Sequence, residues 1–225
     1  MNPIEAVLEA TDRYLSALGA VADEQLREPS LLPGWTRGHV VAHVALNAHG
    51  LARALRGART GEPLAVYDSQ EARDADVGAR AGDSAEDLRA LSQMAALRLA
   101  GELRLMKAGV TIERTPGGRI IDAPSVVGMR WREVEIHRAD LGLDYAPTDW
   151  PAPFAAYLLE ETAEDRDEEL RLTLHALDIE RTVLVGGGGH AVSGTAGDLA
   201  WWLVGRGVGE GLTSTRPLPT LGAWR

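Results

Sequence analysis

Four long segments with helical periodicity occupy the first 145 residues, and their ends carry recognisable helix signals. Asn2, followed by proline, starts the first segment, while Thr36 can cap the second. Ser84 precedes an acidic turn and opens the third. The fourth begins near Pro124 and ends at Gly142, because glycine readily takes the left-handed conformation that closes a helix. Four such helices predict an up-and-down bundle whose inward polar groups can form a site.

The pattern changes after Pro151. A further helix is expected over 154–169, after which leucine alternates with polar residues over 170–174. The run Thr182-Val183-Leu184-Val185 follows a short break, so these two segments are expected to pair as strands. A last helix is expected over 195–206.

These segments predict an α+β fold in two domains. A chain of 225 residues with 45% hydrophobic content can bury one generous core or two smaller ones. We expect a metal-binding four-helix-bundle domain over residues 1–150 and a small α/β domain over residues 151–225.

One spacing in the fourth helix indicates a metal site. Glu133 and His137 are four residues apart, so their side chains leave the same helix face from adjacent turns. A histidine of the second helix can add a third ligand, and residue types alone leave His39 and His43 as alternatives. Two nitrogens and one oxygen with an open fourth position are typical of catalytic zinc.

Two more acidic residues share that helix. Asp140 lies on the face of His137, where it can either orient the imidazole or point into water. Glu135 lies nearly opposite Glu133 around the helix and is expected to be a solvated charge.

The net charge and the composition disfavour several classes of binding partner. A net charge of -10 disfavours nucleic acid and anionic membrane surfaces. No apolar run approaches the roughly 18 residues that span a bilayer, and the acidic start does not read as a signal peptide. We therefore expect a cytoplasmic protein, and no obligate protein partner is evident. The chain has no cysteine, so a reaction that uses a thiol must receive it as a cosubstrate.

Four stretches of the chain resemble one family. The runs 32–43, 66–76 and 129–137 closely resemble mycothiol-dependent maleylpyruvate isomerases, and 194–206 resembles the second domain of that family. The first run is shared with a broader superfamily of thiol-dependent, DinB-like four-helix-bundle metalloenzymes. The second run is more particular to the isomerases.

The resemblance implies a set of functional residues. It selects His43 over His39, which gives a zinc site of His43, Glu133 and His137. It also implies an important arginine in the second domain, best matched by Arg206, with Arg225 as the weaker alternative. A bidentate guanidinium at this position would bind a carboxylate of a dianionic substrate across the domain interface. An arginine of the first domain such as Arg73 is a further alternative for the same role.

The implied activity is a cis–trans isomerisation that uses zinc and mycothiol. Maleylpyruvate would be converted to fumarylpyruvate, a step of gentisate catabolism, by reversible conjugate addition of the cosubstrate thiol. The partners implied are thus a small dicarboxylate and mycothiol. A mycothiol S-transferase that acts on another electrophile is the nearest alternative, and a non-catalytic metal-binding bundle is a distant one.

Overall fold

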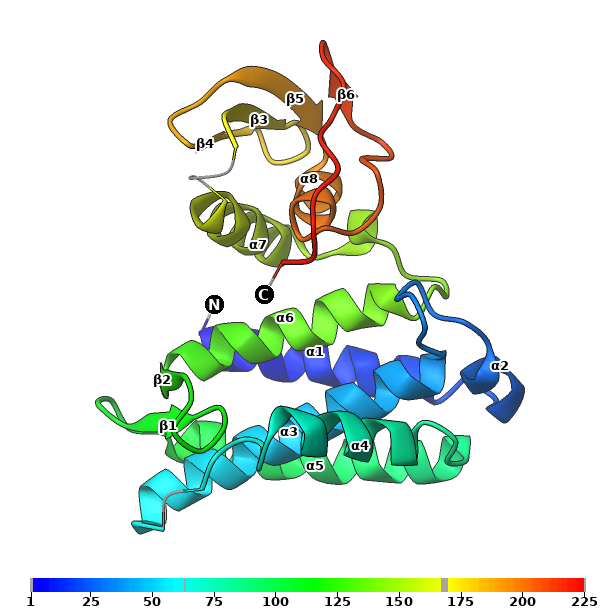
Figure 1. Ribbon diagram of the computed structural model, residues 1–225, viewed down its shortest axis with the longest axis vertical. Helices are drawn as coiled ribbons and strands as arrows, with labels where there is room; N and C mark the ends of the chain where they lie inside the picture. Colours follow the sequence, from blue (N-terminus) through cyan, green and yellow to red (C-terminus); the bar gives the residue numbers. More distant parts are fainter. Residues whose placement is uncertain (1, 63, 167–169, 225) are drawn as a thin grey trace. The chain divides into compact units, whose positions relative to one another are not determined.

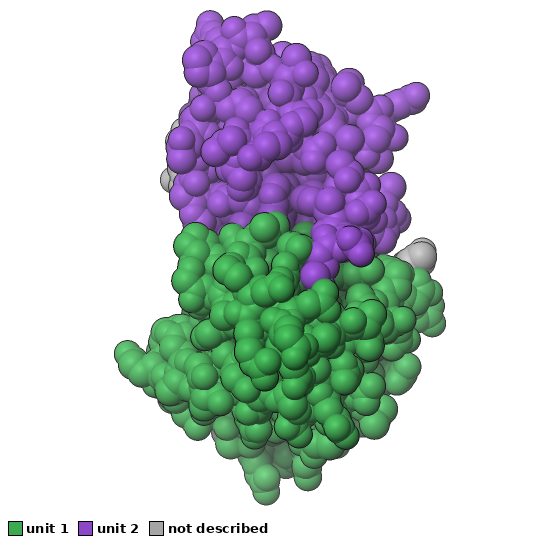
Figure 2. Space-filling model, turned by 90° about the vertical axis from the view of Figure 1, so that its right-hand side faces the viewer, with its two compact units in different colours: residues 1–142 green, residues 143–225 purple. Residues whose placement is uncertain are grey.

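The computed structural model describes residues 2–62, 64–166 and 170–224. The chain divides into two compact units, residues 1–142 (unit 1) and residues 143–225 (unit 2), which are coloured separately in Figure 2. The division falls before the expected boundary at 150/151. The reason is that the 3-10 helix η1 (Pro147–Asp149) packs on a helix of unit 2: a Cβ added to Gly197 would lie 2.0 Å from the carbonyl oxygen of Pro147.

Unit 1 contains the expected four-helix bundle, and the predicted α+β fold class is confirmed (Figure 1). Its long helices are α1 (Pro3–Leu18), α3 (Arg37–Thr60), α5 (Ala85–Leu105) and α6 (Ser125–Asp140). Three smaller features were not predicted: the helices α2 (Asp23–Arg27) and α4 (Gln70–Arg80), and the hairpin of β1 (Thr111–Glu113) and β2 (Ile120–Asp122).

The predicted helix ends are confirmed by their hydrogen bonds. The Asn2 side chain accepts from the Ile4 amide at 3.0 Å, and Thr36 and Ser84 cap α3 and α5 in the same way. Gly142 follows α6 with a φ of +63°, in the left-handed region that favours glycine. Each cap satisfies amide or carbonyl groups that a helix leaves without partners at its ends.

An arginine connects the ends of the two helices that matter most for the site. Arg37 begins α3, and its Nε donates to the carbonyl oxygen of Leu141 at 2.6 Å. The same guanidinium donates to the carbonyl of Gly142 at 3.3 Å and forms an ion pair with Glu28. A cation at the last carbonyls of α6 is favourable because the helix dipole is negative there. The start of α3 and the end of α6 are therefore held together.

The segment after α3 passes very close to that helix. A Cβ added to Gly50 would lie 2.5 Å from the carbonyl oxygen of Val66, so glycine is required for this approach. On its other side the segment bonds to the end of the hairpin, where the amides of Val66 and Tyr67 donate to Glu113 and Arg114 at 2.8 and 2.9 Å. Tyr67 is thereby fixed against α3.

Unit 2 is a small α/β domain. It contains α7 (Ala152–Asp165), α8 (Ala196–Leu203) and a sheet in the order β4-β3-β5-β6. The strands are β3 (Leu172–Ala176), β4 (Arg181–Val185), β5 (His190–Gly194) and β6 (Thr213–Ser214). β3 runs antiparallel to β4 and parallel to β5.

The expected pair of strands in unit 2 is confirmed, whereas β5 and β6 were not predicted. The last helix is shorter than expected, because α8 ends at Leu203 and not at Arg206. The helix expected over 154–169 is present as α7, and positions 167–169 lie outside the described residues. Among the described helices, none combines the length and the apolar character needed to cross a membrane.

Candidate metal centre

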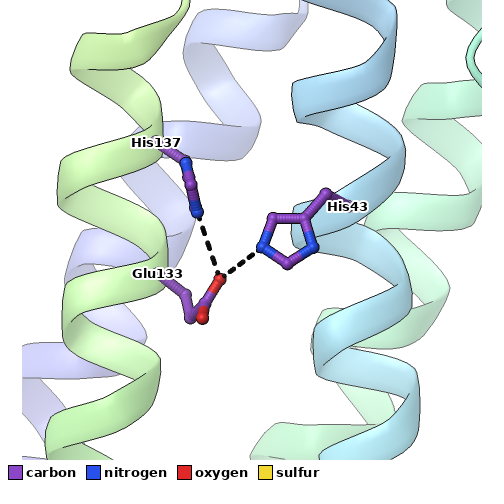
Figure 3. A group of neighbouring side chains, drawn as sticks. All are labelled: His43, Glu133 and His137. Carbon is purple, nitrogen blue, oxygen red and sulfur yellow. Dashed lines mark ion pairs between the residues drawn. The ribbon is translucent and has the colours of Figure 1, made fainter. Parts of the chain in front are cut away.

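Three side chains from two helices meet inside the bundle of unit 1. His43 comes from α3, while Glu133 and His137 come from adjacent turns of α6 (Figure 3). One potential ligand atom of each residue lies within 4.8 Å of the other two. The Glu133 Oε2 atom lies 2.9 Å from His43 Nε2 and 3.4 Å from His137 Nε2. The structure therefore brings together the three residues that the family resemblance implied as metal ligands.

Asp140 holds one of the two imidazoles. Its Oδ2 atom lies 2.8 Å from His137 Nδ1, and the carboxylate is completely buried. Asp140 therefore contacts the imidazole of His137 and does not point into water, which were the two alternatives for this residue. The carboxylate accepts the proton of Nδ1 and so fixes the orientation of the ring, which directs the other ring nitrogen, Nε2, toward Glu133 and His43.

Burial and charge move the pKa values of the three residues in different directions. Burial lowers the pKa of His43 below its usual value, although Glu133 opposes the shift. Burial also acts to lower the pKa of His137, but the hydrogen bonds and charges of Asp140 and Glu133 prevail and raise it to about 9. For Glu133, burial acts to raise the pKa, and the two histidines outweigh it and hold the pKa well below its usual value. The carboxylate is thus ionised at neutral pH.

The opposite edge of His43 contacts α4 and the loop before α3. Arg73 Nη2 lies 2.9 Å from His43 Nδ1, and its guanidinium carbon lies 5.7 Å from the centre of the Trp35 ring. Trp35 also packs on the His43 ring, with ring centres 5.6 Å apart in a T-shaped arrangement. His43 is therefore enclosed on three sides by Glu133, Arg73 and Trp35.

His39, the alternative to His43 as a metal ligand, lies outside the triad. The His39 Nδ1 atom accepts from the Thr36 amide at 3.2 Å and lies 2.8 Å from the Thr36 hydroxyl, so this side chain takes part in capping α3. It is not one of the three clustered residues. The expectation for Glu135 was wrong: the side chain is buried, with 1% exposure, and forms an ion pair with Arg13 of α1 at 3.0 Å.

Four residues near the triad were not expected from the sequence to lie beside the metal-binding residues, although Arg73 was named as an alternative arginine for a substrate carboxylate. The Arg130 side chain is 2% exposed and donates to the Val44 carbonyl at 2.8 Å and to Asn47 Oδ1 at 3.2 Å. Asn47 Nδ2 in turn donates to the Tyr67 hydroxyl at 3.3 Å. The fourth is Arg73. A signal did exist for Arg130, because it precedes Glu133 by three residues and so shares its helix face.

Arg206 belongs to unit 2. It follows α8, is half-buried, and its guanidinium carbon lies 6.0 Å from the centre of the Trp201 ring. Its backbone amide donates to the carbonyl of Trp201 at 3.1 Å. Arg225, the weaker alternative, lies outside the described residues.

The donor set of the triad fits a divalent transition metal. Atoms bound to zinc at about 2.0–2.2 Å in a tetrahedron lie roughly 3.3–3.6 Å from one another. Here Glu133 Oε2 lies 2.9 and 3.4 Å from the two imidazole Nε2 atoms, and the three groups offer ligand atoms within 4.8 Å of one another, so small side-chain shifts would give this geometry. The fold and this cluster define a class, a four-helix bundle with a His–Glu–His triad in which His43 is buried and the other two side chains are half-buried.

Comparisons with known proteins identify the family of the chain. The profile of the mycothiol maleylpyruvate isomerase N-terminal domain matches residues 7–142. The chain belongs to this family, which confirms the resemblance found in the sequence. No match was found among curated proteins.

Two solved structures are similar over nearly the whole chain. One is a mycothiol-dependent maleylpyruvate isomerase, 29% identical, with a TM-score of 0.87. The other is a mutant of a mycothiol-dependent maleylpyruvate isomerase in which one histidine is replaced by alanine, 28% identical, with a TM-score of 0.86. In both comparisons 99% of this chain and 95% of the other are covered, so the likeness includes unit 2.

Proposed function

We propose that this protein is a zinc- and mycothiol-dependent isomerase that converts maleylpyruvate to fumarylpyruvate in the degradation of gentisate. The observation that carries the proposal is the clustered triad of His43, Glu133 and His137 in a chain of this family. The likeness of both units to a solved mycothiol-dependent maleylpyruvate isomerase supports it.

The triad is proposed as the zinc site. His43 and His137 would each bind through Nε2, and Glu133 would add an ionised oxygen and lower the charge of the site by one. A bound zinc ion would supply Lewis acidity, either to lower the pKa of a thiol or to stabilise negative charge on a substrate oxygen.

The chain's own residues prepare this site. Asp140 keeps the proton of His137 on Nδ1, which fixes both the tautomer and the ring orientation. Trp35 covers the His43 ring and limits the access of water from that side. Because the positions of these groups are held by packing, little reorganisation is required when the reaction begins.

The isomerisation requires a single bond where the substrate has a double bond. The thiolate sulfur of mycothiol adds to one alkene carbon, and the electron pair of the double bond moves into the neighbouring carbonyl as an enolate. Rotation about the new single bond and expulsion of the thiolate then give the trans product, with no net oxidation or reduction. The chain has no cysteine, so no internal sulfur can replace the cosubstrate.

Arg206 is retained as the proposed ligand of a substrate carboxylate, on the strength of the resemblance in 194–206. A planar guanidinium suits this role, because its paired N–H groups match the two oxygens of a carboxylate. The cytoplasmic location stays a prediction.

The test is to incubate metal-loaded protein with maleylpyruvate, with and without mycothiol, and to follow the vinyl protons by NMR. Formation of the trans isomer only with the thiol is expected. Accumulation of a stable thiol adduct without the trans product would instead identify an S-transferase. No reaction in the presence of zinc and mycothiol would refute both activities.

Variants of the triad test the metal assignment. Each of His43→Ala, Glu133→Ala and His137→Ala should lose most of the bound zinc and nearly all activity, because three ligands are the minimum for this kind of site. His39→Ala is the matched control, since it removes a histidine from the same helix. Full zinc occupancy in His43→Ala, with loss of zinc in His39→Ala, would move the ligand to His39.

A further inference from the structure

A cavity of about 280 Å³ lies between α3 and the segment that carries Tyr67 and α4. Its charged lining consists of three arginines, Arg53, Arg73 and Arg80, and two carboxylates, Asp68 and Asp76, and Tyr67 and His49 also line it. Two of these residues connect the cavity to the triad. Arg73 contacts His43 at 2.9 Å, and the charge of Glu133 contributes to raising the pKa of Tyr67, after burial. The cavity thus lies beside the proposed metal site.

Most charges of the lining already have partners. Arg53 donates to Asp68 at 2.9 Å and to the carbonyl of Ala65. The guanidinium of Arg73 has a donor without an acceptor in the described part of the chain. Its Nη1 donates to Asp74 at 2.6 Å and its Nη2 contacts His43, whereas its Nε is buried and has no hydrogen-bond partner among the described residues. A buried guanidinium N–H without an acceptor is costly.

The contact between Arg73 and His43 is compatible with only one tautomer of the imidazole. Arginine can only donate, so His43 Nδ1 must accept and the ring proton is on Nε2, which faces Glu133. A neutral His43 that binds metal through Nε2 has its proton on Nδ1 instead. Two N–H groups would then face each other at 2.9 Å. Figure 3 shows that the two nitrogens lie on different edges of the ring.

Metal binding therefore removes the acceptor of Arg73 Nη2. Its neighbour Nε also lacks one, and these two N–H groups form one edge of the guanidinium. That edge is the one suited to a bidentate carboxylate. The stacking on Trp35 and the ion pair with Asp74 continue to hold the guanidinium near His43.

Tyr67 offers a second donor on the same cavity wall. Its hydroxyl oxygen accepts from Asn47, whose amide is oriented by Arg130. The hydroxyl keeps its own proton, because burial first and the charge of Glu133 second raise its pKa. That proton is available to a ligand oxygen.

We propose that Tyr67 and Arg73 form an anion subsite that binds a carboxylate of a small dicarboxylate substrate beside the metal. This inference rests on the proposed function and gives two residues of the run 66–76 a part in substrate binding. Loading of the triad with metal releases the Nε and Nη2 edge of Arg73 to the ligand, so anion binding and metal binding are coupled. A dianion then has this subsite for one of its two carboxylates.

The test uses maleate as the probe, without thiol, and measures its binding by calorimetry to zinc-loaded and zinc-free protein. Zinc-loaded protein should bind maleate more tightly than zinc-free protein. Arg73→Gln should weaken binding roughly 10- to 100-fold, the loss expected for a hydrogen-bonded charge, with zinc content unchanged. Tyr67→Phe should weaken it roughly 3- to 10-fold.

Arg27→Gln is the control, because it removes one positive charge from an exposed position in unit 1. Unchanged maleate affinity in both Arg73→Gln and Tyr67→Phe would overturn the inference, as would an equal loss in Arg27→Gln or no binding by the zinc-loaded parent. Loss of zinc in Arg73→Gln would mean that Arg73 only supports the metal site.

The outcome is separable from that of the proposed function. Should the parent lack isomerase activity while its maleate binding depends on Arg73, the function fails and the subsite remains. Should the isomerase be active with a normal KM in Arg73→Gln, only the subsite fails.

Discussion

Replacement of Asp140 should weaken metal binding while the bundle stays folded. The carboxylate makes a buried, charge-assisted hydrogen bond of 2.8 Å to His137 Nδ1. Such a bond contributes about 1.5–3 kcal/mol, and the loss of a group that orients a metal-bound histidine typically costs about 10- to 100-fold in metal affinity. The two ranges agree, since a factor of ten corresponds to about 1.4 kcal/mol.

Two substitutions at this position separate charge from contact. Asp140→Asn keeps an oxygen acceptor but loses the charge, so about 10-fold weaker zinc binding is expected. Asp140→Ala also releases the ring and should approach 100-fold. Zinc affinity is measured by competition with a chromophoric chelator. Asp12→Asn, an exposed change on α1, is the control and should bind zinc as the parent does.

A folding measurement is needed beside the affinity. The thermal unfolding of each zinc-free variant should remain cooperative, so that a change in affinity refers to a folded site. An unchanged dissociation constant for zinc in folded Asp140→Ala would refute the claim that this carboxylate prepares His137. Equal weakening in Asp12→Asn would mean that net charge, and not the hydrogen bond, governs affinity.

Four other outcomes are expected. Gly50→Ala should destabilise unit 1 by about 1–3 kcal/mol in denaturant titrations, because the added Cβ would lie 2.5 Å from the carbonyl oxygen of Val66. Gly78→Ala is the control and should not destabilise the unit, because a Cβ there meets nothing within 4 Å. Glu102→Gln should cost about 0.5–1 kcal/mol at pH 7. The hydrogen bond and charge of Arg59 lower the pKa of Glu102 in the folded protein. The difference in stability between the parent and Glu102→Gln should therefore persist at any pH above the pKa of this carboxyl in the unfolded chain, and should vanish as the pH falls through its pKa in the folded protein. Arg206→Ala should lower kcat/KM by roughly 30- to 1000-fold with zinc content unchanged, and normal kinetics would exclude the proposed role. Treatment of the protein alone with an alkylating agent should leave thiol-dependent activity intact, and inactivation would count against an external thiol.

Local signals predicted the helical frame well. The caps at Asn2, Thr36 and Ser84 are determined by side chains that bond to amides two or three residues away, so the sequence contains both partners. The same holds for Glu133 and His137, whose spacing alone places them on one face. The selection of His43 needed the family resemblance, because spacing on the second helix left two histidines open.

The predictions that were wrong or missing concern residues and strands whose contacts lie far away in the sequence. Glu135 was taken for a solvated charge because its ion-pair partner, Arg13, lies on a helix far away in the chain. The contact of Arg73 with His43 was equally hidden, since α4 is short and polar and its packing against α3 cannot be inferred from periodicity. β5 was missed because its sequence, His-Ala-Val-Ser-Gly, contains a single β-branched residue. β6 was missed because it has only two residues, and so short a pairing depends on the neighbouring strand.

The origin of the triad on two helices has a thermodynamic consequence. His43 and Glu133 are far apart in the sequence, so an unfolded chain cannot offer all three ligands at once. An ion that binds only the native chain stabilises it by mass action, by about 2.7 kcal/mol at a free concentration 100 times the dissociation constant. Zinc supply would then set how long the protein resists heat and proteolysis, in addition to its proposed part in the chemistry. Cells short of zinc would thus hold less of the protein, as well as less of it in the active form.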